Sequence, residues 1–144
     1  MTKVLDLIQQ KGRNVQTIPT TTSIADAAQA FLDAGVSSFL VSDGDTVVGI
    51  FTKNDLVRRC VAEPEGFDTG LVGECMTTDL ITASPGDDLN EVLDDMIRRG
   101  LRHMPVVDDG RAVGMITPVD ILLYQNHLVR FENDELVRYI HGGY

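Results

Sequence analysis

The feature that most constrains this chain is an internal repeat. Shifting the sequence by 65 positions lays residues 15–57 on residues 80–122 without a gap. The identical pairs are Thr17/Thr82, Gly35/Gly100, Val41/Val106, Asp43/Asp108, Val48/Val113, Gly49/Gly114, Thr52/Thr117 and Asp55/Asp120. Because a sequence period of this size is typical of a repeated structural unit, we expect a fold with two similar halves.

Each copy contains the same amphipathic helix. The apolar positions are Ile24, Ala27, Ala28, Phe31 and Leu32 in the first copy and Leu89, Val92, Leu93, Met96 and Ile97 in the second. This spacing of i, i+3, i+4, i+7 and i+8 is typical of one helix face. Ser23 and Asp88 stand where an N-cap is expected, and Gly35 and Gly100 stand where a C-terminal glycine cap would fall.

A β-hairpin is predicted behind each of these helices. The runs SSFLVS from Ser37 and RHMPVV from Arg102 have strand character. Each is followed by an acidic turn that contains glycine and then by VVGIFT or AVGMIT. Two strand-like runs joined by such a turn favour an antiparallel pair.

Further elements complete the pattern. We expect a short strand before each amphipathic helix, at 15–18 and 80–83, and a second helix after each hairpin, from Lys53 and from Pro118. A helical segment also leads each copy, VLDLI in the first and VGECM in the second. The predicted class is α/β (α+β), with two tandem βαββα units packed as one pseudo-twofold module because neither unit can cover its sheet alone.

The end of each hairpin carries a shared signature, hydrophobic-Gly-hydrophobic-hydrophobic-Thr-x-x-Asp, which reads VGIFTKND at 48–55 and VGMITPVD at 113–120. Two such units resemble the CBS domain pair, named after cystathionine β-synthase, and MPVVD at 104–108 matches the strand pattern of that family. The resemblance covers residues 3 to about 126. We expect repeat 1 at 3–61, a linker at 62–70, repeat 2 at 71–126 and a C-terminal helical tail at 127–144. The tail is similar to that of small bacterial proteins that consist of this pair.

The resemblance implies a regulatory role. Members of the family bind adenine nucleotides such as AMP, ADP, ATP, NAD(H) or S-adenosylmethionine as regulatory ligands in clefts between the paired units. We therefore expect an adenine nucleotide as ligand, no catalytic cofactor, a homodimer and a partner protein that responds to binding.

Two Thr-x-x-Asp pairs are the leading candidates for ligand contact, Thr52 with Asp55 and Thr117 with Asp120. A threonine hydroxyl can hydrogen-bond a phosphate, and an aspartate one helical turn later can accept hydrogen bonds from ribose hydroxyls. The alternative is that each pair caps the helix that follows, with the hydroxyl accepting a backbone N–H. Both roles are compatible.

The resemblance also points to the residues that would bind the rest of the nucleotide. Main-chain groups near the first strand of each unit would contact adenine, which selects Thr17 and Ile18, and Thr82 and Ala83. An Arg-His pair before the Met-Pro strand would reach the phosphates, which selects Arg102 and His103 with the adjoining Met104 and Pro105.

The two copies differ in chemistry. The residues aligned with Arg102 and His103 are Ser37 and Ser38, and many relatives place an arginine where this chain has Asn54 and Val119. We therefore expect two unequal sites, with Asn54 beside Asp55 in the better equipped one.

Composition disfavours several other functions. The net charge of −10 and the lack of a basic run argue against nucleic-acid binding. No apolar run approaches the roughly 20 residues of a membrane span, and the N-terminus does not resemble a signal peptide, so a cytoplasmic protein is expected. Cys60 and Cys75 are expected to be reduced.

Catalysis is disfavoured because there is no glycine-rich phosphate loop and no metal-ligand spacing among the three histidines. The alternative function is a dimerisation or adaptor protein without ligand. Its docking face would lie on the C-terminal helix, at Leu128, Phe131, Leu136, Val137 and Ile140. The same residues could instead pack within the chain.

Overall fold

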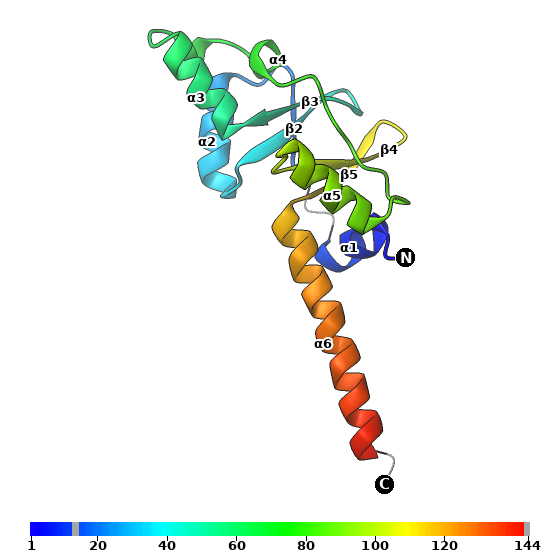
Figure 1. Cartoon of the computed structure of the whole chain (residues 1–144). Coiled ribbons are helices and arrows are strands. Elements are labelled where there is room, and N and C mark those ends of the chain that lie inside the picture. The colour runs from blue at the N-terminus through cyan, green and yellow to red at the C-terminus, as the bar shows by residue number, and fades with distance from the viewer. Residues whose placement is uncertain (13–14, 143–144) are drawn as a thin grey trace.

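The computed structural model describes residues 1–12 and 15–142, with side chains described to residue 140. The first part of the chain forms α1 (Val4–Lys11), β1 (Thr17–Pro19), α2 (Ile24–Ala34), β2 (Ser38–Asp43), β3 (Thr46–Thr52) and α3 (Lys53–Ala62). After a short 3-10 helix, η1 (Phe67–Thr69), the second part forms α4 (Val72–Cys75), α5 (Leu89–Arg99), β4 (Met104–Asp108), β5 (Arg111–Ile116) and α6 (Pro118–Gly142). The order of elements repeats, as the sequence predicted (Figure 1).

Both predicted hairpins are confirmed. Strand β2 pairs antiparallel with β3, and β4 pairs antiparallel with β5. Strand β1 adds to the first hairpin in parallel, which gives a sheet of order β1-β2-β3. The hairpins of the two units meet where the amide of Val47 donates to the carbonyl of Gly110 at 3.1 Å.

The strand predicted at 80–83 is wrong, because this segment forms only a single bridge between Ala83 and Val106. The aligned positions explain the difference. In the first unit the amide of Leu40 donates to the carbonyl of Gln16 and extends the ladder. Its counterpart in the second unit is Pro105, which has no N–H to donate, so the ladder does not extend from Ala83 back to residue 81.

The amphipathic helices begin and end as predicted. The side chain of Ser23 accepts the amide of Asp26 at 3.0 Å, and Asp88 accepts the amide of Asn90 at 2.9 Å. Gly35 and Gly100 end α2 and α5 in the left-handed conformation, with φ of 65° and 66°. A side chain with a Cβ would be strained at both positions.

In each amphipathic helix, one residue that was predicted to lie on the buried face is exposed. Leu32 is 75% exposed and its counterpart Ile97 is 65% exposed. The narrower buried faces consist of Ile24, Ala27 and Phe31 on α2 and of Leu89, Val92 and Met96 on α5.

The leading helices are exchanged between the two units. Val4, Leu7 and Ile8 of α1 lie in the hydrophobic core of the second unit, with α5, β4, β5 and the start of α6. Val72 of α4 lies in the core of the first unit, beside α2, β2 and β3. Each unit therefore completes its core with a segment that the sequence places before the other one, which joins the two units into one module.

The signature glycines make this exchange possible. A Cβ built on Gly49 would lie 2.6 Å from Sδ of Met76 and 2.9 Å from the carbonyl oxygen of Thr77, directly after α4. A Cβ built on Gly114 would collide with the side chain of Ile8 on α1. Glycine at these strand positions allows the exchanged segment to approach the sheet closely.

Helix α6 extends away from the rest of the molecule (Figure 1). It runs through residues 126 and 127 without a break, so the proposed limit between repeat 2 and the C-terminal tail falls inside one helix. The limits of the repeats and of the linker stay predictions. Within residues 1–12 and 15–142, no helix is both long and apolar enough to cross a membrane.

Candidate functional site: a cleft between the two units

A cleft of about 820 Å³ lies where the start of α3 faces the loop between α5 and β4. The first unit contributes the end of β3 and the beginning of α3, and the second unit contributes the loop. The lining residues are Ser37, Ile50, Thr52, Lys53, Asn54, Asp55, Arg58, Thr77, Gly100, Leu101, Arg102 and His103. The volume lies within the range of about 300–1,000 Å³ that is usual for small-molecule sites.

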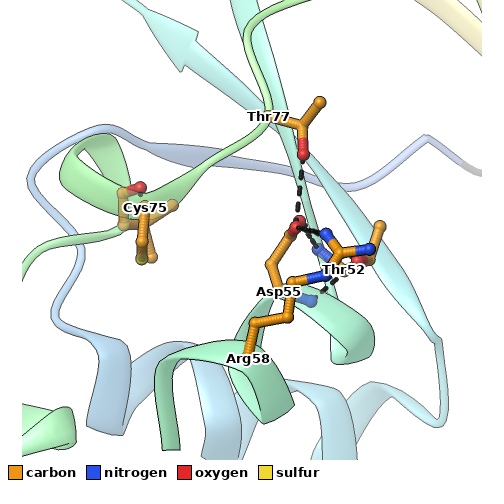
Figure 2. A network of polar contacts seen from close by, with 6 residues as sticks. Thr52, Asp55, Arg58, Cys75 and Thr77 are labelled. Carbon is orange, nitrogen blue, oxygen red and sulfur yellow. Dashed lines mark hydrogen bonds and ion pairs between the residues drawn. The ribbon is translucent and has the colours of Figure 1, made fainter. Parts of the chain in front are cut away.

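Asp55 is the most buried polar group at this cleft, with 6% of the residue exposed. Its Oδ2 accepts the amide of Thr52 at 2.9 Å and the hydroxyl of Thr52 at 3.1 Å. Its Oδ1 accepts the hydroxyl of Thr77 at 3.2 Å and Nη1 of Arg58 at 3.3 Å. Figure 2 shows Thr77 and Arg58 reaching this carboxylate from different segments of the chain.

The capping interpretation of the Thr-x-x-Asp pairs is confirmed. The Thr52 hydroxyl accepts the amide of Asp55 at 3.1 Å, and the Asp55 carboxylate accepts the amide of Thr52 in return. Thr117 and Asp120 make the same reciprocal pair. These bonds hold the start of α3 and of α6 in place, and ligand contact by the same residues stays a prediction.

The structure brings together groups that the sequence distributes over the two copies. Arg102 and His103 belong to the second copy, yet they line the same cleft as Thr52, Asn54 and Asp55 of the first. Lys53 and Arg58 add two more cations. An anion in this cleft would therefore face positive charge from both units, although the whole chain carries a net charge of −10.

His103 is the group shared with a second cleft. Its Nε2 lies 3.1 Å from the hydroxyl of Ser37. Burial lowers the pKa of His103 below its usual value, and the charges of Arg102 and Lys11 lower that pKa further, against the opposing effect of Asp120. The imidazole is therefore neutral at pH 7 and able to gain a proton when an anion binds beside it.

The second cleft is smaller, about 310 Å³, and lies around the end of β5. Its lining residues are Lys11, Val15, Gln16, Gly35, Val36, Ser37, Ser38, Lys53, His103, Met115 and Thr117. The second cleft is the pseudo-twofold counterpart of the first. Residues 35–38 line the second cleft, and the aligned residues 100–103 line the first.

Lys11 lines the second cleft and pairs with Asp120. Its Nζ lies 2.6 Å from Oδ2 of Asp120 and 2.7 Å from the carbonyl oxygen of Met115. Burial by itself raises the pKa of Asp120, but the hydrogen bonds from Lys11 and Thr117 and the charge of Lys11 outweigh burial, so the pKa lies below its usual value. Asp120 is thus a paired carboxylate.

The residues predicted to contact adenine lie elsewhere. Thr82, Ala83 and Met104 line a third cavity of about 340 Å³ with the acidic side chains of α5. The amide and the carbonyl of Ala83 are both used in hydrogen bonds, with Pro105 and Val107 respectively. These three residues therefore line a different cavity from the one that Arg102 and His103 line.

The other predicted contacts are also separate from the two clefts. Pro105 is buried within β4. Thr17 and Ile18 lie on β1 at the edge of the first sheet, and the lining of the two clefts includes neither of them. Val15 and Gln16, directly before β1, line the second cleft instead.

Sequence reasoning missed Lys11 and Thr77, which contact the two signature aspartates. Both follow the leading helical segments, and the likeness of VLDLI to VGECM was the available signal. The exchange of these segments between the units could not be deduced from that likeness. In the described part of the chain, no group of three or more His, Cys, Asp or Glu side chains is arranged to hold a metal ion.

The repeated fold, the exchanged helices and the paired Thr-x-x-Asp caps define a known class. The chain belongs to the CBS domain family, whose sequence pattern matches residues 6–62 and 72–127.

Among its relatives, protein MJ1225 of Methanocaldococcus jannaschii is 32% identical over 110 residues, and protein MK0525 of Methanopyrus kandleri is 30% identical over 129 residues. These alignments cover 76% and 88% of this chain, but only 39% and 66% of the two relatives. The chain therefore spans less than two thirds of the length of these two proteins.

Solved structures show the same architecture. The CBS-domain protein ATU1752 from Agrobacterium tumefaciens has a TM-score of 0.78 and 29% identity, and the comparison covers 86% of this chain and 99% of that one. The CBS domain pair of protein MJ0100, in complex with 5′-methylthioadenosine and S-adenosyl-L-methionine, has a TM-score of 0.73 and 26% identity, over 88% of this chain and 98% of that one. The prediction of a CBS pair with both helices and sheets is thus confirmed.

Proposed function

We propose that this chain is a regulatory module that binds an adenosine-containing ligand in the 820 Å³ cleft and signals occupancy to a partner protein. The observation that carries the proposal is the composition of that cleft. It combines the Thr52 and Asp55 cap of one unit with the Arg102 and His103 loop of the other. A ligand that contacts both would stabilise one relative arrangement of the two units.

The charges of the cleft favour a phosphate group. Lys53, Arg58 and Arg102 supply fixed positive charge, and His103 can become positive. The cleft also includes the first residues of α3, where the helix dipole favours an anion, although the amides of Lys53 and Asp55 already donate to Ser37 and Thr52. An AMP, ADP or ATP phosphate has the matching chemistry.

The ribose would be held by Asp55. Its present partners on Oδ1 are the hydroxyl of Thr77 and Nη1 of Arg58. Arg58 is 76% exposed in its side chain and is free to turn toward a phosphate. A ribose hydroxyl can then take the place that Arg58 leaves, so that both charges remain paired.

Similarity to a solved CBS pair supports an adenosine-containing ligand. The CBS pair of MJ0100, at 26% identity, binds two adenosine derivatives. By family resemblance we also propose a cytoplasmic homodimer without enzymatic activity, whose response to the nucleotide regulates another protein.

Isothermal titration tests this proposal with AMP, ADP, ATP, NADH and S-adenosylmethionine. Arg102→Gln should weaken the binding of a phosphorylated ligand by about tenfold, since a charge-assisted hydrogen bond contributes about 1.5–3 kcal/mol. Arg111→Gln is the matched control, because Arg111 is 74% exposed in its side chain and lies outside the cleft. If none of the five compounds binds at about 1 mM, the proposal fails.

A second candidate function is a ligand-free dimerisation or adaptor protein. The observation in its favour is the exposed apolar surface of α6, where Val129, Leu136 and Ile140 are 62%, 61% and 56% exposed. Light scattering after gel filtration tests whether this surface joins chains. A dimer that is lost in Leu136→Gln/Ile140→Gln, but kept in the control Glu135→Gln, would support it if none of the five compounds binds the wild-type chain.

A further inference from the structure

The two clefts differ most at their signature aspartates. Each aspartate is approached by the chain that follows an exchanged leading helix. In the larger cleft this chain presents the neutral hydroxyl of Thr77 to Asp55. At the smaller cleft Lys11, the last residue of α1, presents its ammonium group to Asp120, which does not line that cleft but borders a pocket of about 170 Å³ that shares Lys11 with it. The difference is therefore built into the segments that hold the two units together.

Lys11 is held firmly in this position. Its Nζ makes a hydrogen bond of 2.6 Å with Asp120 and one of 2.7 Å with the main chain of Met115. Lys11 is the last residue of α1, and that helix is fixed in the second core by Leu7 and Ile8. Only 32% of the Lys11 side chain and 24% of the Asp120 side chain are exposed. The pair is thus partly shielded from water, and its attraction is stronger than that of a fully exposed pair.

A ribose that binds Asp120 with both of its hydroxyls, one on each carboxylate oxygen, would have to break this pair. Oδ2 of Asp120 already accepts the amide of Thr117 and Nζ of Lys11. A ribose hydroxyl is neutral and cannot replace the charge of Lys11. The exchange at Asp55 is easier, because one of its partners there is a hydroxyl and the other is the mostly exposed Arg58.

We infer that Lys11 acts as a built-in competitor for the ribose position of the second cleft, so that each chain binds one adenosine-containing ligand and not two. The inference rests on the proposed function for the nature of the ligand. It assigns Lys11 as the residue that determines stoichiometry and makes the two clefts of one module unequal. Asp55 lines the cleft of about 820 Å³, whereas Asp120 borders a pocket of about 170 Å³ together with Lys11 and is absent from the lining of the second cleft, which agrees with this role.

Calorimetric titration of AMP into Lys11→Met tests the inference. Methionine keeps the length and the apolar stem of lysine but cannot pair with Asp120. The wild-type chain should bind one AMP, and Lys11→Met should bind a second one, with affinity at that cleft raised by about tenfold or more. Lys3→Met is the matched control on the same helix, and it should bind one AMP, because Lys3 lines neither cleft.

Amide chemical shifts locate the second AMP. In Lys11→Met, the resonances of Thr117 and Asp120 should move on titration, whereas in the wild-type chain the shifts should be confined to residues around Thr52 and Asp55. Two AMP molecules in the wild-type chain would overturn the inference and leave the proposed function intact. So would a loss of affinity in Lys11→Met, which would make Lys11 a ligand contact.

Binding of AMP to the variant but not to the wild-type chain would separate the two proposals. If the wild-type chain binds no AMP and Lys11→Met binds one at Thr117 and Asp120, the role of Lys11 stands and the larger cleft is not the nucleotide site. If neither protein binds AMP or any of the other four compounds, both proposals fail.

Discussion

The ring of His103 and the hydroxyl of Ser37 lie 3.1 Å apart and connect the two units at the boundary between their clefts. Both residues come from the loop between an amphipathic helix and the hairpin behind it, in opposite copies. Because His103 lines both clefts, protonation of its ring adds positive charge to each.

Phosphate binding should therefore depend on pH through His103. Burial and Arg102 lower the pKa of the free imidazole, and a bound phosphate favours the protonated form. Relative to His103→Gln, AMP affinity should rise as the pH falls from about 7.5 to about 5.5, with uptake of a proton on binding, because protonation of the phosphate itself, with a pKa of about 6, weakens binding in both proteins alike. Calorimetry in buffers of different ionisation enthalpy measures that proton.

The variant His103→Gln should lose this proton uptake. His127→Gln, on the exposed surface of α6, should keep it. The titration of the AMP phosphate itself is common to all three proteins. A pH dependence that is the same in His103→Gln and the wild-type chain would contradict the prediction.

Asp55→Ala should destabilise the fold by about 2 kcal/mol. The substitution removes the reciprocal bond of the capping box, at about 1 kcal/mol, and leaves the partly buried amide of Thr52 and the hydroxyl of Thr77 without this acceptor. Urea denaturation measures the free energy of unfolding. Asp26→Ala is the control, because Asp26 occupies the same position of α2, where the cap is the side chain of Ser23. That variant should lose at most about 0.5 kcal/mol.

Gly49→Ala should destabilise the protein by about 1–3 kcal/mol, since a Cβ at this position collides with Met76 and with the main chain of Thr77. Gly86→Ala provides the control, because a Cβ there meets nothing within 4 Å and the backbone does not have positive φ. It should leave stability unchanged or raise it by up to about 1 kcal/mol. Equal unfolding midpoints for the two variants would show that the exchanged segment does not need the close approach.

Acid stability should reveal the pair of Lys11 and Asp120. The pKa of Asp120 lies below its usual value of 3.8, so the pair contributes stability above that pH and loses its contribution as the pH falls through the lowered pKa. In Lys11→Met, burial still raises the pKa of Asp120, but the hydrogen bond and the charge of Lys11, which both lower that pKa, are absent. Carboxyl carbon NMR should show Asp120 titrating at higher pH than in the wild-type chain.

The same measurement on Lys3→Met should give the wild-type titration curve for Asp120. The unfolding free energy of Lys11→Met should differ from that of the wild-type chain at neutral pH, and the difference should shrink under acid conditions where both proteins have a protonated Asp120. An unchanged titration of Asp120 in Lys11→Met would refute the electrostatic role of the pair.

The sequence by itself determined the interior of each unit. The spacing of Ile24, Ala27 and Phe31, the caps at Ser23 and Gly35, and the turn between the strands are local signals, because each depends on residues that are close in sequence. The duplicated Thr-x-x-Asp pairs were likewise identified as caps from four consecutive residues. Sequence also gave the family, since the pattern occurs twice in register.

The tertiary structure decided which segments meet. Only the folded chain places α1 in the second core and α4 in the first, brings Arg102 beside Asp55, and pairs Lys11 with Asp120. It also shows that Pro105 ends a ladder that Leu40 continues in the other unit. These relationships join residues far apart in sequence, and their energies depend on packing, burial and charge that exist only after the two units have come together.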